Sequence, residues 1–101
     1  MASYFNISGE STQQLFAPGN KELVNKISLA NIEGTNKCTV DLYIEKKLTG
    51  KFYLLKGVEL PIGTSLIYDT VTFSNAENEF GLYIKLTKSA SETPTVDVII
   101  Y

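Results

Sequence analysis

Carboxylate pairs are the first residues in this sequence that could perform chemistry. Asp41 and Glu45 lie on one face of an apparent strand, and Glu77 and Glu79 lie two positions apart in a turn-like stretch. A glycosidase would hold two such groups across a cleft, about 5 Å apart or about 6.5–9.5 Å apart depending on its mechanism. Nothing in the sequence places either pair across a cleft, so we expect solvated side chains and no catalysis.

Oxygen ligands for a hard cation are the second possibility. Asn75, Glu77, Asn78 and Glu79 cluster in one segment, and calcium takes oxygen ligands from loops. The spacing does not match the acidic pattern of a calcium-binding loop. We therefore expect no metal site and interpret this segment as a solvated loop.

The single cysteine and the absence of histidine exclude further chemistry. Cys38 would be a nucleophile only if a cationic environment lowered its pKa, and the neighbouring Lys37 points to the opposite face of a strand. Without histidine the chain has no Ser-His or Cys-His dyad, and one cysteine forms no intrachain disulfide or multi-cysteine metal site. We expect no enzyme activity, no catalytic residue and no cofactor.

The charge balance argues against nucleic acid as a partner. The 101 residues include nine lysines, no arginine and eleven acidic residues, for a formal net charge of −2. Nucleic-acid binding depends on neutralising phosphates with a basic face. The closest approach to a basic patch is Lys46, Lys47 and Lys51 at an apparent hairpin tip, where lysines commonly keep a strand edge soluble.

Membrane and export signals are also missing from the pattern. No apolar run reaches the roughly 18 residues of a spanning helix. Residues Met1–Gly19 show neither a basic leader nor the apolar core of a signal peptide. We expect no membrane association and a chain that is made in a cytoplasm.

The elements that must position these residues are strands. In Thr39–Lys46 the side chains of Val40, Leu42 and Ile44 alternate with polar or aromatic ones, which predicts a half-buried strand. The same alternation recurs around Tyr53–Leu60, Leu66–Tyr68, Leu82–Leu86 and Val96–Ile100. Segment Lys21–Ile32 fits either a helix or a strand, and its three weak helix formers favour a strand: Asn25, Ser28 and Asn31.

Turn signals separate these strands. Leu48–Gly50 predicts a short hairpin loop, Glu33–Asn36 a longer one, and Pro61–Thr64 a tight turn flanked by strands. Breakers at intervals of about 8 to 12 residues indicate a sandwich or small barrel. We predict an all-β chain with one antiparallel β-sandwich or jelly-roll-like domain of about 7–8 strands. The domain spans 21–101, and residues 1–20 form an N-terminal arm or an edge strand.

Aromatic and apolar residues outside the predicted core are the candidate contacts to a partner. Tyr43 and Tyr101 point away from the apolar faces of their strands, and Ile99 shares the face of Tyr101. Either a second sheet or a neighbouring chain must cover such a face. The polar N-terminal segment adds isolated apolar points. The predicted partner-binding residues are Tyr4, Phe5, Ile7, Leu15, Phe16, Tyr43 and Tyr101.

Three segments carry a resemblance to a known class of proteins. They are Lys26–Asn31 (KISLAN), Thr39–Ile44 (TVDLYI) and Tyr53–Asp69, which contains the strand–turn–strand pattern KGVELPIGTSLIYD. Together they resemble small virion structural proteins of tailed bacteriophages, especially those of marine cyanobacterial phages. The resemblance implies a non-enzymatic β-sandwich that occurs in many copies on the particle, and it brings no catalytic residues.

The resemblance therefore leads to two functional expectations. The first is a capsid decoration or cement protein in the virion, which binds the major capsid protein or other virion proteins and forms a dimer or trimer. In this version Met1–Phe16 adds a strand to a neighbouring subunit. The alternative is a carbohydrate-binding or host-recognition module of a tail fibre or baseplate, in which sugars stack on Tyr43 or Tyr53.

Overall fold

The computed structural model describes residues 3–18, 23–46, 49–69, 73–74 and 80–101. Within these ranges the chain forms strands and loops and contains no helix. The strands are β1 (Ser3–Ser8), β2 (Gln13–Phe16), β3 (Leu23–Val24), β4 (Ile27–Asn31), β5 (Cys38–Lys46), β6 (Gly50–Leu60), β7 (Ser65–Tyr68), β8 (Phe73–Ser74), β9 (Phe80–Lys88) and β10 (Thr95–Ile100). The all-β prediction is confirmed, including the strand interpretation of the segment that holds β3 and β4.

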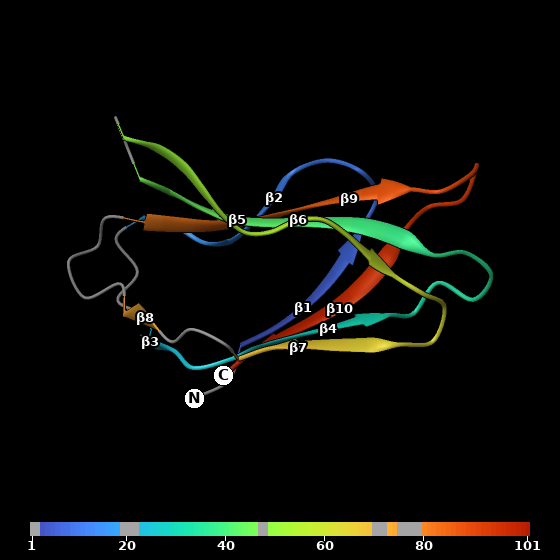
Figure 1. Cartoon of the computed structure of the whole chain (residues 1–101), viewed down its shortest axis with the longest axis horizontal. Coiled ribbons are helices and arrows are strands. Elements are labelled where there is room, and N and C mark those ends of the chain that lie inside the picture. The colour runs from blue at the N-terminus through green and yellow to red at the C-terminus, as the bar shows by residue number, and fades with distance from the viewer. Residues whose placement is uncertain (1–2, 19–22, 47–48, 70–72, 75–79) are drawn as a thin grey trace.

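Eight of these strands form two antiparallel sheets that lie face to face (Figure 1). Sheet A has the order β1-β10-β4-β7, and sheet B has the order β2-β9-β5-β6. The short pair β3 and β8 lies at one end of the sandwich. Two four-stranded sheets connected in this order form a jelly roll, the more specific of the two predicted architectures.

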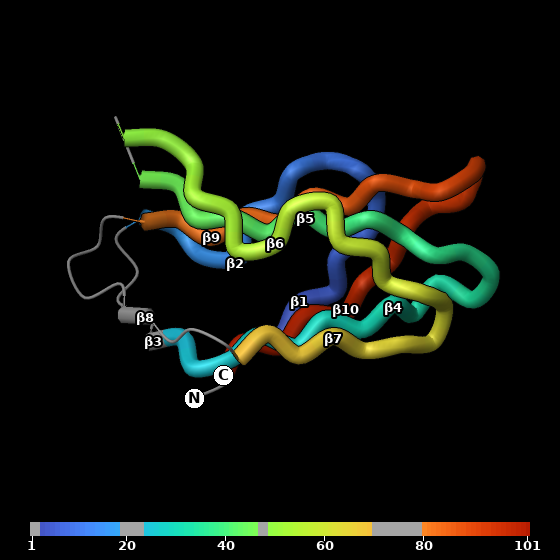
Figure 2. The backbone as a smooth tube through the Cα atoms, in the orientation of Figure 1, coloured from blue at the N-terminus to red at the C-terminus, as the bar shows by residue number. Residues whose placement is uncertain are grey.

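The chain pairs with itself as one long antiparallel ribbon whose tip lies near Thr49. β1 pairs with β10, β2 with β9, β3 with β8, β4 with β7, and β5 with β6. Wrapping the ribbon on itself adds the ladders between β10 and β4 and between β9 and β5. Figure 2 shows the result, with the start of the chain in blue beside its red end. Of the predicted loop at Leu48–Gly50, Thr49 and Gly50 lie at this tip, and the N–H of Thr49 donates to Lys46 O at 3.0 Å. Residues 47–48 lie outside the described ranges.

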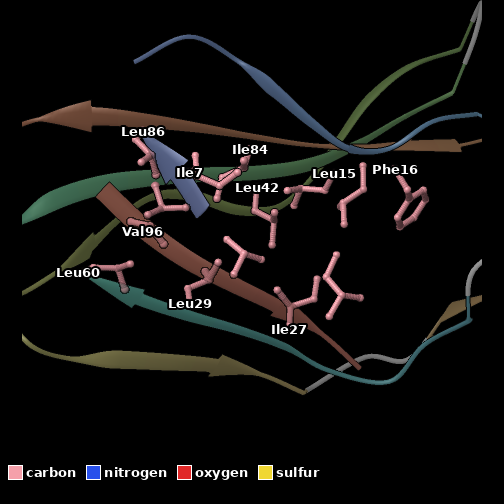
Figure 3. Packing of buried hydrophobic residues seen from close by; sticks show 14 of the residues in the cluster. Ile7, Leu15, Phe16, Ile27, Leu29, Leu42, Leu60, Ile84, Leu86 and Val96 are labelled. Atoms are coloured by element: carbon pink, nitrogen blue, oxygen red, sulfur yellow. The ribbon is translucent and has the colours of Figure 1, made fainter. Parts of the chain in front are cut away.

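The core lies between the sheets and is built mostly from alternate residues of the strands, together with the adjacent Leu15 and Phe16 of β2. Ile27 and Leu29 of sheet A face Leu42 and Ile84 of sheet B (Figure 3). All four side chains are fully buried. Each such side chain contributes about 1.5–3 kcal/mol through burial. The alternation that predicts the strands therefore also predicts which side chains form the core.

Strand β6 departs from regular pairing at two places along β5. Its register shifts between the partners of Val40 and Leu42, and again between those of Leu42 and Tyr43. At the first shift Gly57 has a φ of 66°, and its N–H donates to Asp41 Oδ1 at 2.7 Å. An extra residue bends and twists a strand, and glycine takes the positive φ without strain. The outward carboxylate of Asp41 thus fixes a bulge.

Two predicted turns connect the sheets and not neighbouring strands. The hairpin prediction for Glu33–Asn36 is wrong, because this loop connects β4 of sheet A with β5 of sheet B. Pro61–Thr64 is a tight turn flanked by strands as predicted, with Gly63 at a φ of 69°, and it connects β6 with β7. The same residue types serve both kinds of connection, so turn chemistry alone does not distinguish them.

The N-terminal segment is part of the sandwich. β1 is an edge strand of sheet A, and β2 is an edge strand of sheet B. Ile7, Leu15 and Phe16 are all buried in the core. Residues 3–16 therefore form two edge strands and do not extend away from the body as an arm.

Candidate protein-binding surface

The outer face of sheet A carries a row of side chains that crosses all four strands and is apolar on three of them; we call it the apolar row. Tyr4 of β1 lies opposite Ile99 of β10, Ile99 opposite Ser28 of β4, and Ser28 opposite Ile67 of β7. Tyr4 is 73% exposed and Ile67 is 55% exposed. We call the surface that surrounds this row the sheet-A face. It is formed by the outward residues Tyr4, Asn6, Ser8, Ser28, Ala30, Ser65, Ile67, Thr95, Asp97 and Ile99.

Of the ten residues that form the sheet-A face, one is charged, Asp97, and its Oδ1 accepts a hydrogen bond from Asn6 Nδ2 at 2.6 Å. Lys26 borders the face, with its Nζ 4.6 Å from the ring centroid of Tyr101. A shallow depression of about 190 Å³ lies over β1 and β10 beside this pair, and its lining includes Tyr4 and Ile99. The rest of the face consists of small hydroxyl or methyl side chains and the apolar row. This surface is flat, weakly polar and slightly hollowed at one edge.

The outer face of sheet B is chemically different. Its outward positions include Asp41, Glu45, Lys85 and Glu59. Lys56 Nζ lies 3.6 Å from Asp41 Oδ2, and Lys37 Nζ lies 3.1 Å from Glu59 Oε2. A solvated face of an antiparallel sheet normally has this polar character. The comparison singles out the sheet-A face as the one without the usual charged cover.

A tyrosine cluster occupies the centre of the sheet-B face. The Tyr43 ring stacks on Tyr83 with centroids 5.4 Å apart and packs against Tyr53 at 5.1 Å. Lys51 Nζ lies 4.9 Å from the centroid of Tyr43, and Lys56 Nζ lies 4.6 Å from that of Tyr53. Tyr43 is only 5% exposed as a result. The rings that cover Tyr43 belong to β6 and β9 of the same chain.

The structure separates the predicted partner-binding residues into exposed, half-buried and buried ones. Tyr4 is exposed on the sheet-A face. Tyr101, directly after the end of β10, is 40% exposed, and Lys26 Nζ lies 4.6 Å from its ring centroid. Phe5 points inward and is half-buried against the core. The remaining four are buried and offer a partner almost no surface: Ile7, Leu15, Phe16 and Tyr43. For these four the assignment as partner contacts is corrected, because this chain's own sheets cover them.

The two isoleucines of the sheet-A face, Ile67 and Ile99, are absent from the predicted set. Ile67 stands in a strand, Ser65–Tyr68, in which apolar residues follow one another without alternation. Such a run places an apolar side chain on both faces, and that signal could have identified Ile67. Ile99 is predicted to point away from the core but becomes significant only because Tyr4 and Ile67 lie in the same row. That neighbourhood depends on strand order, which the sequence does not show.

Two of the residues that the sequence offers for chemistry, Cys38 and Asp41, have structural roles. Cys38 is buried, and burial raises the pKa of its thiol, with the carboxylates of Glu92 and Glu33 acting in the same direction. A protonated thiol in the core is not an activated nucleophile. Asp41 supports the bulge in β6. Asn75, Glu77, Asn78 and Glu79 lie outside the described residues.

The described part of the chain shows no cluster of acidic, cysteine or histidine side chains that could hold a metal ion. Within the same residues, no helix is long and apolar enough to cross a membrane.

Comparison with known proteins identifies the fold. No protein-family model matches the sequence, and no curated protein matches it. The crystal structure of PirA superposes with a TM-score of 0.60 at 11% identity, covering 97% of this chain and 92% of that chain. The Yersinia pseudotuberculosis-derived mitogen superposes with a TM-score of 0.58 at 13% identity, covering 99% of this chain and 84% of that one.

A weaker similarity is to the structure of infectious bursal disease virus, Gx strain. Its TM-score is 0.41 at 9% identity, and the match covers 98% of this chain and 32% of the viral chain. A superposition at this level carries no functional argument. The first two similarities establish that this chain shares a β-rich fold with proteins of very different sequence.

Proposed function

We propose that this chain is a non-catalytic structural protein of a phage virion, of the decoration or cement type, which attaches to shell proteins through the sheet-A face. The observation that carries the proposal is the composition of that face. Ten outward residues include one charge, and the exposed Tyr4 and Ile67 lie in one row with Ile99.

The physical argument rests on what this face would cost and gain in an interface. The central part of a protein interface is depleted of charge and enriched in aromatic and aliphatic side chains. Covering the sheet-A face requires the desolvation of one carboxylate, and Asn6 already bonds to that carboxylate. The backbone beneath is held by three ladders, so little conformational entropy is lost on binding.

The choice of a virion protein as partner comes from the sequence resemblance. The resembling stretch Lys26–Asp69 includes β4 and β7, which supply Ser28, Ala30, Ser65 and Ile67 to the face. The same surface would thus be shared with the phage proteins that this stretch resembles. A protein that occurs in many copies on a shell needs a rigid, repeatable contact area, and an antiparallel sheet face has those properties.

The geometry gives less support to the carbohydrate-binding alternative. A sugar would stack on an open tyrosine ring, and Tyr43 is enclosed by Tyr53 and Tyr83. Tyr53 is more exposed, but Lys56 Nζ lies over its ring. Loss of glycan binding in Tyr53→Ala, if any such binding is found, would favour the alternative over the proposal.

The proposal is tested with the Ile67→Glu variant in assembled particles. A glutamate at this exposed position changes stability little, within about 0.5 kcal/mol, but places a new carboxylate in the apolar row. We expect at least a tenfold loss of the protein from purified particles. The matched control is Thr87→Glu, at an exposed outward position of sheet B, which should be incorporated like the wild type. Equal incorporation of both variants would contradict the proposal.

A further inference from the structure

The open edge of β1 differs from the other sheet edges among the described strands. β1 pairs with β10 over six residues, Ser3–Ser8, with no shift in register. The strand SYFNIS contains no charged residue and no proline. Natural proteins usually protect an edge with lysine, proline, a bulge or a very short strand. β1 has none of these features.

Each of the other three edges of the two four-stranded sheets has at least one protective feature. β2 is four residues long and has a register shift between Gln14 and Phe16. β6 has two register shifts and carries Lys51 and Lys56. β7 is four residues long. The long, regular and uncharged edge is therefore a specific property of β1.

The main-chain groups available on this edge follow from the hydrogen bonds that flank it. The N–H of Gly9 donates to Pro94 O at 3.0 Å, so odd-numbered residues of β1 bond to β10. On the other side of β10, the N–H of Ile32 donates to Thr95 O at 3.1 Å, which confirms that odd-numbered residues of β10 face β4. The N–H and C=O groups of Tyr4, Asn6 and Ser8 therefore point out of the sheet edge. Ser8 O already accepts a hydrogen bond from Gln13 Nε2 at 2.9 Å, so a donor from a partner strand would use its second lone pair or replace that side chain.

We infer that two copies of this chain pair through β1 in antiparallel orientation, about a two-fold axis at Asn6. In this register Tyr4 lies opposite Ser8 of the second copy, and Asn6 lies opposite Asn6 of the second copy. All three outward-facing residues then form hydrogen-bonded pairs, and each copy contributes three N–H and three C=O groups. Sheet A of one copy and sheet A of the second copy then form one eight-stranded sheet.

Side-chain direction agrees with this register. Pairing an even-numbered residue with an even-numbered one keeps both cores on the same side of the joined sheet. Phe5, which is half-buried at the margin of the core, then lies opposite Ile7 of the second copy and gains cover. The sheet-A faces of the two copies form one continuous surface.

The occupant is a second copy because the edge complements itself. A two-fold antiparallel pair places each residue near its own counterpart, so any charge on the strand would meet a like charge. β1 has no charge. Tyr4, Asn6 and Ser8 carry a hydroxyl, an amide and a hydroxyl, and this order of hydrogen-bonding groups is the same when the strand is reversed. The inference uses the edge of sheet A and not its face, so it stands independently of the proposed function.

Substitution of Asn6 by proline tests the inference without disturbing the ladder inside the chain. Proline removes the N–H of residue 6, which points outward and is not used in pairing with β10; proline is tolerated at such edge positions. Because Asn6→Pro also removes the side-chain bond to Asp97, the matched control is Asn6→Ala, which keeps the outward N–H. Circular dichroism verifies that both variants retain the β fold.

Sedimentation equilibrium gives the decisive masses. We expect the wild type and Asn6→Ala to approach 22.4 kDa, twice the 11.2 kDa of the chain, with dissociation constants within tenfold of each other. Folded Asn6→Pro should sediment as a monomer, with a dissociation constant at least 100-fold higher. A monomeric wild type at high micromolar concentration, or a dimeric Asn6→Pro, would overturn the inference.

Disulfide formation at introduced cysteines tests the register and remains informative if Asn6→Pro fails to fold. Facing residues of a hydrogen-bonded antiparallel pair have Cα atoms about 5.5 Å apart, within the range that a disulfide spans. Asn6→Cys should therefore form an interchain disulfide on mild oxidation, while the native Cys38 is buried and does not compete. Ser65→Cys on the opposite edge is the control. Equal cross-linking at both edges would contradict pairing through β1.

Discussion

At the scale of single residues, Asn31 shows how one buried amide joins the two sheets. Its side chain is 3% exposed, and its Nδ2 donates to Leu60 O at 2.9 Å and to Asn36 O at 3.1 Å. Its Oδ1 accepts from the N–H of Glu33 at 3.0 Å. One side chain at the end of β4 thus holds both the loop that leaves sheet A and the last residue of β6.

Replacing this amide by a side chain of similar size is expected to destabilise the fold. In Asn31→Leu three backbone groups lose their partner, one in a buried place and two in half-buried ones, so we expect a loss of about 2–4 kcal/mol in the free energy of unfolding. Urea denaturation followed by fluorescence measures it. The control Asn25→Leu, at an exposed position, should stay within about 0.5 kcal/mol of the wild type. Equal stability of the two variants would contradict the role of Asn31.

The sequence predicts individual burial well where strands alternate and poorly where they do not. Val40 and Leu42 are assigned correctly to the core from period-two spacing. Tyr43 is predicted to point outward, and it does, but its burial by Tyr53 and Tyr83 depends on which strands flank β5. Leu15 is misassigned as a partner contact because a short, mostly polar segment gives no periodicity from which to infer a core position.

At the scale of elements, two carboxylates organise the loops at one end of the sandwich. Partial burial raises the pKa of Glu33, but hydrogen bonds from Thr35 and Asn36 outweigh that effect and hold the pKa below its usual value. The N–H groups of Ser89 and Ala90 likewise donate to Glu92 and lower its pKa. In each loop the carboxylate accepts the hydrogen bonds that a main-chain carbonyl accepts in an ordinary turn.

These lowered pKa values predict the sign of the acid response. A carboxyl with a lower pKa in the folded state stabilises that state fully above its unfolded pKa, and this contribution is lost as the pH falls through the folded value. Unfolding free energy should therefore decrease in the acidic range where Glu33 and Glu92 become protonated. The free energy of unfolding of the double variant Glu33→Gln/Glu92→Gln should decrease less steeply with falling pH. Urea denaturation at a series of pH values across that range measures it. An unchanged slope would contradict the loop account.

The first two strands are expected to be essential to the fold. They supply an edge to each sheet and bury Ile7, Leu15 and Phe16. Deletion of residues 1–14 removes β1 entirely and half of β2, so we expect a chain without a cooperative unfolding transition. Thermal denaturation by circular dichroism measures this. A truncated chain that melts cooperatively near the wild-type temperature would show that the segment is a removable arm after all.

At the scale of the whole molecule, strand identity is predictable and strand order is not. Local alternation identifies the long strands because each depends only on neighbours in sequence. The order β1-β10-β4-β7 joins residues almost a whole chain length apart, such as Ser3 and Ile100, and no local pattern encodes that pairing. The sheet-A face has the same origin, since Tyr4, Ile99 and Ile67 become neighbours only through this order.

The jelly roll also explains how one small domain can have two unlike faces. Each strand exposes one side, and the two sheets turn these sides in opposite directions (Figure 1). Sheet B carries the ion pairs and lysine-covered tyrosines of a solvated surface. Sheet A carries the weakly polar surface on which the proposed function rests.

The measurement that tests the proposed virion function most directly is the protein composition of purified phage particles from host cells that produce this chain. Quantitative mass spectrometry gives the copy number of the chain relative to the shell protein. Attachment through the sheet-A face as a decoration protein predicts a copy number of the same order as that of the shell protein. Absence of the chain from the particles, or its presence in only a few copies, would contradict the account.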